Sequence, residues 1–118
     1  MLTLYGYNKC STCRNAKKYL DQHGLNHTFI DITEQPPPQA LLKAILKAGD
    51  YQLKDLFNKS GVQYRELNMK DKLPNLSEAE ALKLLTQNGK LCKRPIITNG
   101  KKYTVGYKED VMKAVWGS

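Results

Sequence analysis

The chain has 118 residues and carries 19 Lys and Arg against 11 Asp and Glu, which gives a formal net charge of +8. Hydrophobic residues make up 41% and charged residues 25%, an ordinary globular composition that excludes collagen-like, mucin-like and wholly disordered chains. No apolar run approaches the ~20 residues that span a bilayer, and the N-terminus lacks the pattern of a secretory signal. We therefore expect a cytoplasmic protein without a membrane segment.

The first third of the chain predicts a strand, a helix and a second strand. Residues 2–5 alternate in polarity and indicate the first strand, and residues 28–32 indicate the second. Between them, one helical face is marked at i, i+3, i+4 and i+7 by Ala16, Tyr19, Leu20 and His23. Gly24 is expected to end this helix. The three elements form a βαβ unit, whose crossover is nearly always right-handed.

The middle third is predicted to be helical. Three prolines at 36–38 introduce a new segment, and the apolar residues that follow lie at helical spacing until Gly49. A further short helix is expected around Leu53, followed by a less regular segment that carries Arg65. The run from Ser77 to Glu80 has the form of a capping box and predicts the start of another helix.

The last third returns to strands and ends in a helix. Residues 95–98 and 101–105 flank Asn99 and Gly100, a pair that favours a type I′ hairpin turn with positive φ at both positions. Residues 111–115 suggest a final helix. The order β-α-β, several helices, β-β, α predicts an α/β protein with a mixed four-stranded sheet covered by helices.

Two of the three cysteines form a Cys-x-x-Cys motif at the predicted strand-to-helix junction, Cys10 and Cys13. A cysteine at a helix N-terminus gains from the backbone N–H groups and the positive dipole end, which can lower its pKa from about 8.5 to roughly 3.5–7.5. Arg14, one turn further on, can reach the same sulfur or a bound anion. We therefore interpret Cys10 as a nucleophile and Cys13 as a resolving thiol.

Other interpretations of the motif remain open. Zinc sites also use Cys-x-x-Cys, but they usually need four ligands, and Cys92 with His23 and His27 does not supply a second pair. We expect no metal at the pair and no bound cofactor. The cysteines can also be unremarkable, and Cys92 is most simply a small hydrophobic core residue.

A second segment, Arg94-Pro95-Ile96-Ile97, opens a predicted strand with a proline. A cis bond before Pro95 would bring backbone groups beside the thiol for substrate docking. Taken alone, the segment favours the trans bond, because only about 5–6% of X-Pro bonds in folded proteins are cis.

Together, Cys10-Ser11-Thr12-Cys13-Arg14 and the Arg94-Pro95 segment resemble the arsenate reductase-like (ArsC/Spx) family of thioredoxin-fold proteins, and the resemblance runs from about residue 2 to 115. It implies a single thioredoxin-like domain over residues 1–118, with a helical insertion at about 36–90 between strands 2 and 3. It also implies that Pro95 is cis.

In the reductases of this family, one cysteine attacks arsenate and three arginines hold the oxyanion. The resemblance assigns the nucleophile to Cys10 and two of the arginines to Arg65 and Arg94. The third falls near Val105-Gly106-Tyr107, where this chain has no arginine. Lysine does not replace the planar, bidentate guanidinium, so this gap argues against true arsenate reduction.

The paired cysteine resembles the Spx branch, whose members are redox-switched transcriptional regulators that bind RNA polymerase. The resemblance therefore implies either a thiol oxidoreductase supplied with electrons by glutathione or a dithiol protein, or a regulator of that kind. The basic charge suits an anionic partner, but the basic residues are scattered and typical of a lysine-rich solvated surface. We expect a monomer that does not bind nucleic acid directly.

Overall fold

The computed structural model describes residues 2–7, 9–59 and 61–116. A four-stranded mixed sheet has the order β2-β1-β3-β4. β1 (Leu2–Gly6) pairs in parallel with β2 (His27–Asp31), and it pairs antiparallel with β3 (Ile96–Thr98), which pairs antiparallel with β4 (Tyr103–Val105). This confirms the predicted thioredoxin-like sheet, with helices inserted between strands 2 and 3.

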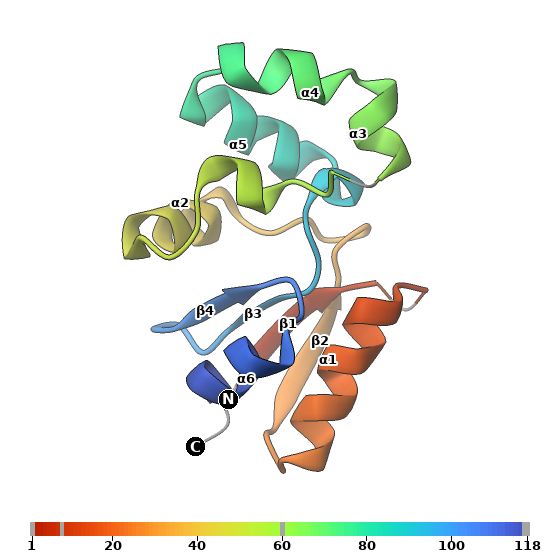
Figure 1. Cartoon of the computed structure of the whole chain (residues 1–118), viewed down its shortest axis with the longest axis vertical. Coiled ribbons are helices and arrows are strands. Elements are labelled where there is room, and N and C mark those ends of the chain that lie inside the picture. Colours follow the sequence, from red (N-terminus) through yellow and green to blue (C-terminus); the bar gives the residue numbers. More distant parts are fainter. Residues whose placement is uncertain (1, 8, 60, 117–118) are drawn as a thin grey trace. The chain divides into compact units, whose positions relative to one another are not determined.

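Two helices cover one face of the sheet (Figure 1). α1 (Ser11–Gln22) joins β1 to β2, and α6 (Glu109–Trp116) follows β4. Their apolar sides and that face of the sheet form one buried cluster, made by Leu2, Leu4, Ala16, Tyr19, Leu20, Ile97, Met112 and Trp116. The Trp116 indole Nε1 donates to Thr104 Oγ1 at 3.0 Å, so this polar pair is satisfied inside the core.

The chain divides into two compact units. The first comprises the N-terminal residues up to Asp31 and resumes at Arg94, and the second runs from Ile32 to Lys93. The second unit holds only helices and their connections. They are α2 (Gln39–Ala48), η1 (Leu53–Leu56), α3 (Val62–Glu66), α4 (Met69–Lys72), η2 (Leu73–Asn75), α5 (Glu78–Gln87) and η3 (Gly89–Leu91).

Within the second unit, α2 packs against α5 through buried aliphatic side chains that include Leu42 and Leu85. The capping box predicted at the start of α5 is confirmed, because Glu80 N donates to Ser77 Oγ and Ser77 N donates to Glu80 Oε1, each at 3.2 Å. An antiparallel bridge between Phe57 and Cys92 pairs the residue that follows η1 with the residue that follows η3.

Two local predictions were wrong. The segment expected to be irregular contains the short helix α3, with Tyr64 as its buried residue. The hairpin turn also differs from type I′, because among the described residues only Asn68 and four glycines have positive φ, and Asn99 is not among them. Asn99 instead accepts from Lys101 N and Lys102 N, each at 2.8 Å, through its side-chain oxygen, and Gly100 alone takes the left-handed value of 91°.

No helix in the described part of the chain is both long and apolar enough to cross a membrane.

Candidate thiol site

Cys10 is the N-cap residue of α1, so its sulfur lies at the helix end where backbone N–H groups are unpaired. Its backbone is extended, its N–H donates to Tyr7 O at 3.0 Å, and its carbonyl accepts from Arg14 N at 3.1 Å. The side chain is half-buried. The loop after β1 and the first turn of α1 therefore hold the thiol at a fixed place while leaving it reachable from solvent.

Several groups determine the protonation of Cys10. Partial burial alone would raise the pKa of this thiol, but hydrogen bonds from Thr12 and Cys13 and the charge of Arg94 outweigh it, so the pKa is lowered. Cys10 Sγ lies 2.9 Å from Thr12 Oγ1. When the sulfur is ionised, the hydroxyl is the donor. The result is a thiol with enhanced thiolate character, which is the reactive form of cysteine.

Cys13 has the opposite character. It is 1% exposed, on the buried side of α1 against β1, and burial raises the pKa of its thiol to about 12. The neighbouring Cys10 raises it further, whereas Tyr7 and Arg94 lower it. A Cβ placed on Gly6 would lie 3.2 Å from Cys13 Sγ, so the absence of a side chain at Gly6 makes room for this sulfur. All three cysteines are free thiols, and Cys13 is protonated at neutral pH.

Arg94 and Pro95 lie at the start of β3, beside the two thiols. The guanidinium carbon of Arg94 lies 5.5 Å from the ring centroid of Tyr7, a cation–π contact that orients the side chain. The Arg94–Pro95 peptide bond is cis, which confirms what the family resemblance implied. The Pro95 carbonyl accepts from Gly106 N at 2.8 Å, which ties this loop to the end of β4.

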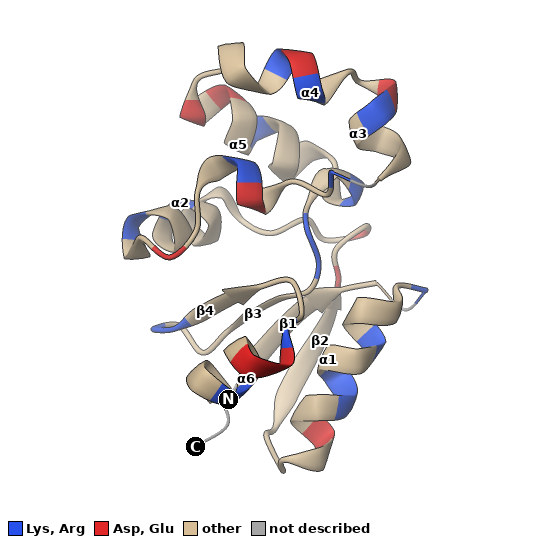
Figure 2. Cartoon of the chain, viewed as in Figure 1, with Lys and Arg blue, Asp and Glu red and all other residues tan. Residues whose placement is uncertain are grey.

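The other two predicted arginines are not among the groups that shift the pKa of either thiol. Arg14 is exposed on α1, where it lines a shallow depression with Lys17, Lys18, Asp21 and Gln22. These cations form a basic stripe along the helix (Figure 2). Arg65 is exposed on α3, which belongs to the second unit. A role for either arginine in binding an oxyanion remains a prediction.

Two residues of the site were missed from the sequence. One is Thr12, whose hydroxyl contacts the nucleophile. The other is Tyr7, whose ring forms the cation–π contact with Arg94. The available signal was the identity of the residues between the cysteines, because a hydroxyl two positions after an N-cap thiol lies within reach of its sulfur.

The alternative interpretation as a metal site gains no support. Among residues 2–7, 9–59 and 61–116, no cluster of three or more His, Cys, Asp or Glu side chains is placed to hold an ion. Cys92, which a zinc site would need, is fully buried in the second unit, and its thiol donates to Leu85 O at 3.6 Å. This confirms the interpretation of Cys92 as a core residue.

Comparison with known proteins points to one family. The ArsC family sequence model matches residues 5–115. The protein YusI of Bacillus subtilis (strain 168) is 51% identical over 115 residues, which cover 98% of each chain. The global transcriptional regulator Spx of Enterococcus faecalis (strain ATCC 700802 / V583) is 31% identical over 96% of this chain and 84% of the regulator. The crystal structure of a possible arsenate reductase from Streptococcus mutans UA159 has a TM-score of 0.86 and 44% identity, covering 94% of this chain and 97% of that one.

Proposed function

The chain belongs to the ArsC family, and we propose that within it this protein is a cytoplasmic, thiol-dependent redox protein that uses Cys10 as nucleophile and Cys13 as resolving thiol. The observation that carries the proposal is the contrast between the two sulfurs. The half-buried one has a lowered pKa, and the buried one three residues later has its pKa raised to about 12. Such a pair supplies one thiolate for attack, while the second thiol stays protonated until the resolving step.

The proposed chemistry with a disulfide substrate proceeds in two exchanges. The Cys10 thiolate attacks one substrate sulfur, the substrate S–S bond breaks, and the first substrate thiolate leaves. Cys13 then loses its proton to water and attacks Cys10 Sγ, which releases the second substrate thiolate and forms a Cys10–Cys13 disulfide. The two thiols are thereby oxidised by two electrons and the substrate is reduced. Two molecules of glutathione, or a dithiol protein, restore the pair.

The buried thiol becomes easier to ionise at the step that needs it. In the resting protein, Cys10 raises the pKa of Cys13, both by hydrogen bonding and by its charge. Once Cys10 Sγ is bonded to the substrate, it carries no charge, and both effects disappear. The charge of Arg94, which lowers the pKa of Cys13, then acts without that opposition. Attack by Cys13 is therefore favoured only after the mixed disulfide has formed.

An oxyanion is the other substrate class that this site would suit. A tetrahedral oxyanion needs planar cations such as Arg94, and the missing third arginine makes a disulfide the better substrate. Turnover should therefore be measured side by side with a small disulfide and with arsenate, using glutathione as reductant.

The decisive experiment combines turnover with alkylation by iodoacetamide at different pH values. We expect Cys10→Ser to abolish turnover and Cys92→Ser to leave it unchanged. In the Cys13→Ser variant, the mixed disulfide with the substrate should accumulate and be visible by mass spectrometry. The alkylation rate of Cys10 should reach half its maximum below the pH expected for a free thiol. Full turnover by the Cys10→Ser protein would refute the proposal.

The similarity to Spx favours a second candidate function, a redox-switched transcriptional regulator that docks on RNA polymerase. The specific observation is 31% identity to a global transcriptional regulator over 96% of the chain. In this case the Cys10–Cys13 disulfide would be a signal rather than an intermediate. Pull-down with purified RNA polymerase, in dithiothreitol and after oxidation, separates the two functions. Binding in one state with negligible turnover supports the regulator, and no binding in either state excludes it.

A further inference from the structure

The second unit contains a pocket that the thiol chemistry does not use. It has a volume of about 440 Å³, within the range of small-molecule sites. It is formed by η1, the following segment, α3, α4 and η2, and eight residues line it: Gln52, Leu53, Lys54, Lys59, Tyr64, Lys70, Leu73 and Pro74. All of them belong to the second unit, so the pocket is complete within it.

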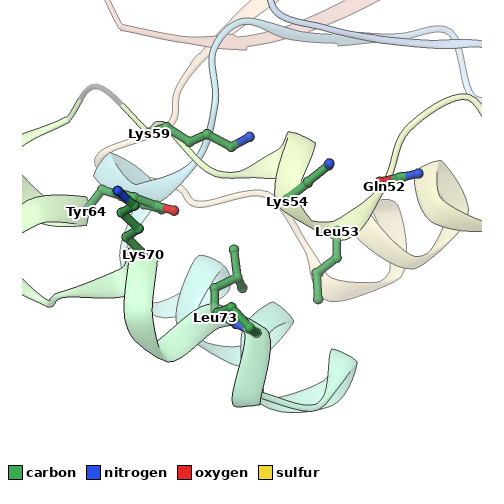
Figure 3. A pocket seen from close by; sticks show the side chains of 8 residues that line it. Gln52, Leu53, Lys54, Lys59, Tyr64, Lys70 and Leu73 are labelled. Atoms are coloured by element: carbon green, nitrogen blue, oxygen red, sulfur yellow. The ribbon is translucent and has the colours of Figure 1, made fainter.

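The lining is divided by chemistry. In Figure 3 the amino groups of Lys59 and Lys54 and the hydroxyl of Tyr64 lie on one side of the pocket, and Leu53 and Leu73 lie on the other. This arrangement is amphipathic. One side can cover an apolar surface, and the other offers cations and a hydroxyl.

The lining of the pocket carries a net positive charge. No acidic residue lines it, and within the described residues none of Lys54, Lys59 and Lys70 forms an ion pair. The acidic residues that directly follow two of these lysines, Asp55 and Asp71, are not part of the lining, and Asp55 Oδ2 accepts from Gln52 N at 2.8 Å in the capping box of η1. Within the lining, a bound anion would therefore meet three lysines and no carboxylate.

Tyr64 adds a hydroxyl to the lining of the pocket. Its side chain is 9% exposed, and its ring packs edge-on against Phe57 with centroids 6.4 Å apart. The Tyr64 hydroxyl borders the pocket, where it can donate a hydrogen bond to a ligand atom.

We propose that this pocket binds a small amphipathic organic anion, with an apolar body and a single carboxylate or sulfonate group. The apolar body would lie against Leu53, Leu73 and Pro74, and the headgroup would accept hydrogen bonds from Tyr64 Oη and the lysine amino groups. An inorganic anion would leave the leucines uncovered, and an uncharged apolar compound would leave the lysines unpaired. The chemistry of the lining selects a ligand that combines both parts.

The test uses the intact protein and two probes. 8-Anilinonaphthalene-1-sulfonate is titrated by fluorescence, and decanoate is then used to displace it, with decanol as the uncharged counterpart and inorganic phosphate as the headgroup alone. We expect one saturable site, displacement by decanoate, and little displacement by decanol or phosphate. Displacement by decanol as effective as by decanoate, or by phosphate alone, would overturn the proposal.

Matched variants locate the site. Lys54→Gln with Lys70→Gln should weaken decanoate binding about tenfold, which corresponds to about 1.4 kcal/mol. Lys43→Gln with Lys47→Gln, which removes the same charge from α2 of the same unit, should leave binding unchanged. Tyr64→Phe, which keeps the ring, should also weaken it.

Circular dichroism checks that each variant is folded, and amide chemical-shift changes on adding decanoate provide a readout that does not depend on mutation. Those changes should be confined to residues 52–74. An equal loss of decanoate affinity in the two double lysine variants, or chemical-shift changes spread over the whole chain, would indicate binding to a diffuse basic surface. Either result would refute a specific site in the pocket. Cys10 alkylation should be unaffected by the pocket variants, so this test stands apart from the proposed function.

Discussion

The two thiols of one helical turn differ because their surroundings differ, not because of the motif itself. Cys10 stands at the N-terminal end of α1 with a hydroxyl and a guanidinium nearby, whereas Cys13 faces β1 and is almost completely removed from solvent. Desolvation disfavours the charged form, and donors favour it. The reactive sulfur is therefore the one that keeps its hydrogen-bond donors and its access to solvent.

The hydroxyl of Thr12 is predicted to contribute directly to the reactivity of Cys10. In Thr12→Val the shape of the side chain is kept and the 2.9 Å hydrogen bond to Cys10 Sγ is lost, so the pKa of Cys10 should rise. The rate of iodoacetamide alkylation at pH 7 should then fall several-fold, with its inflection moved to higher pH. Thr12→Ser retains the hydroxyl and should react like the natural protein. An unchanged pH profile in Thr12→Val would show that the hydrogen bond does not stabilise the thiolate.

At the scale of single elements, the start of α5 shows how a local motif stabilises a helix. Ser77 and Glu80 satisfy each other's backbone N–H groups, and the acidic residues of the first turn complement the helix dipole. The hydrogen bonds to Ser77 lower the pKa of Glu80. Because this group favours the charged form in the folded protein, its contribution to stability is present above the ordinary pKa of 4.5 and is lost as the pH falls through the lowered value.

Removing the cap should cost a measurable part of the free energy of unfolding. We expect Ser77→Ala to lower it by about 1 kcal/mol, the typical value for loss of an N-cap hydroxyl. Glu80→Gln should retain the helix geometry. Its unfolding free energy should fall less on acidification, because the variant lacks the carboxylate that is protonated. Glu78→Gln, which changes the other acidic residue of the same turn, serves as the control. It should retain the decrease in unfolding free energy on acidification that is due to Glu80. Urea unfolding between pH 3 and 7 measures all three variants.

At the scale of the whole molecule, the order of elements could be predicted because each depends on local patterns of polarity, capping and turn residues. Close contacts between residues that are distant in sequence could not be predicted in this way. A Cβ on Gly89 would overlap Ile32 O, so the backbone at 32 and 89 meets where no side chain fits, and no local pattern in the sequence marks this contact. The cis bond before Pro95 followed only from the family resemblance, because base rates favour trans.

The candidate site was predictable to the same extent. Cys10, Cys13 and Arg94 are brought together by the strand-to-helix junction and the start of β3, which the sequence pattern had located. The placement of Tyr7 beneath Arg94 depends on how the loop after β1 folds back, and no periodic pattern encodes it. The pocket in the second unit was also invisible in the sequence, because its lining residues come from five short segments without a shared motif.

Burial of Cys13 makes the stability of the molecule depend on alkaline pH. Its folded pKa is raised from 9.0 to about 12, so the folded state holds the thiol proton more tightly than the unfolded state does. The stability that this thiol contributes is fully present below pH 9 and is lost as the pH rises towards 12. Lysines and tyrosines also titrate in this range, so the measured quantity is the difference between the natural protein and Cys13→Ala.

In dithiothreitol, unfolding free energies from urea titration should differ by a constant amount between the natural protein and Cys13→Ala at pH 6–8. Cys13→Ala is expected to be the less stable protein there, because it loses buried apolar contacts. Above pH 9 the natural protein should lose stability faster, and the difference should shrink. The same measurement on Cys92→Ala tests whether removing any buried thiol gives the same dependence of the unfolding free-energy difference on pH. A difference that stays constant up to pH 11 would mean that unfolding does not change the ionisation of Cys13, and the contrast between the two thiols would lose its physical basis.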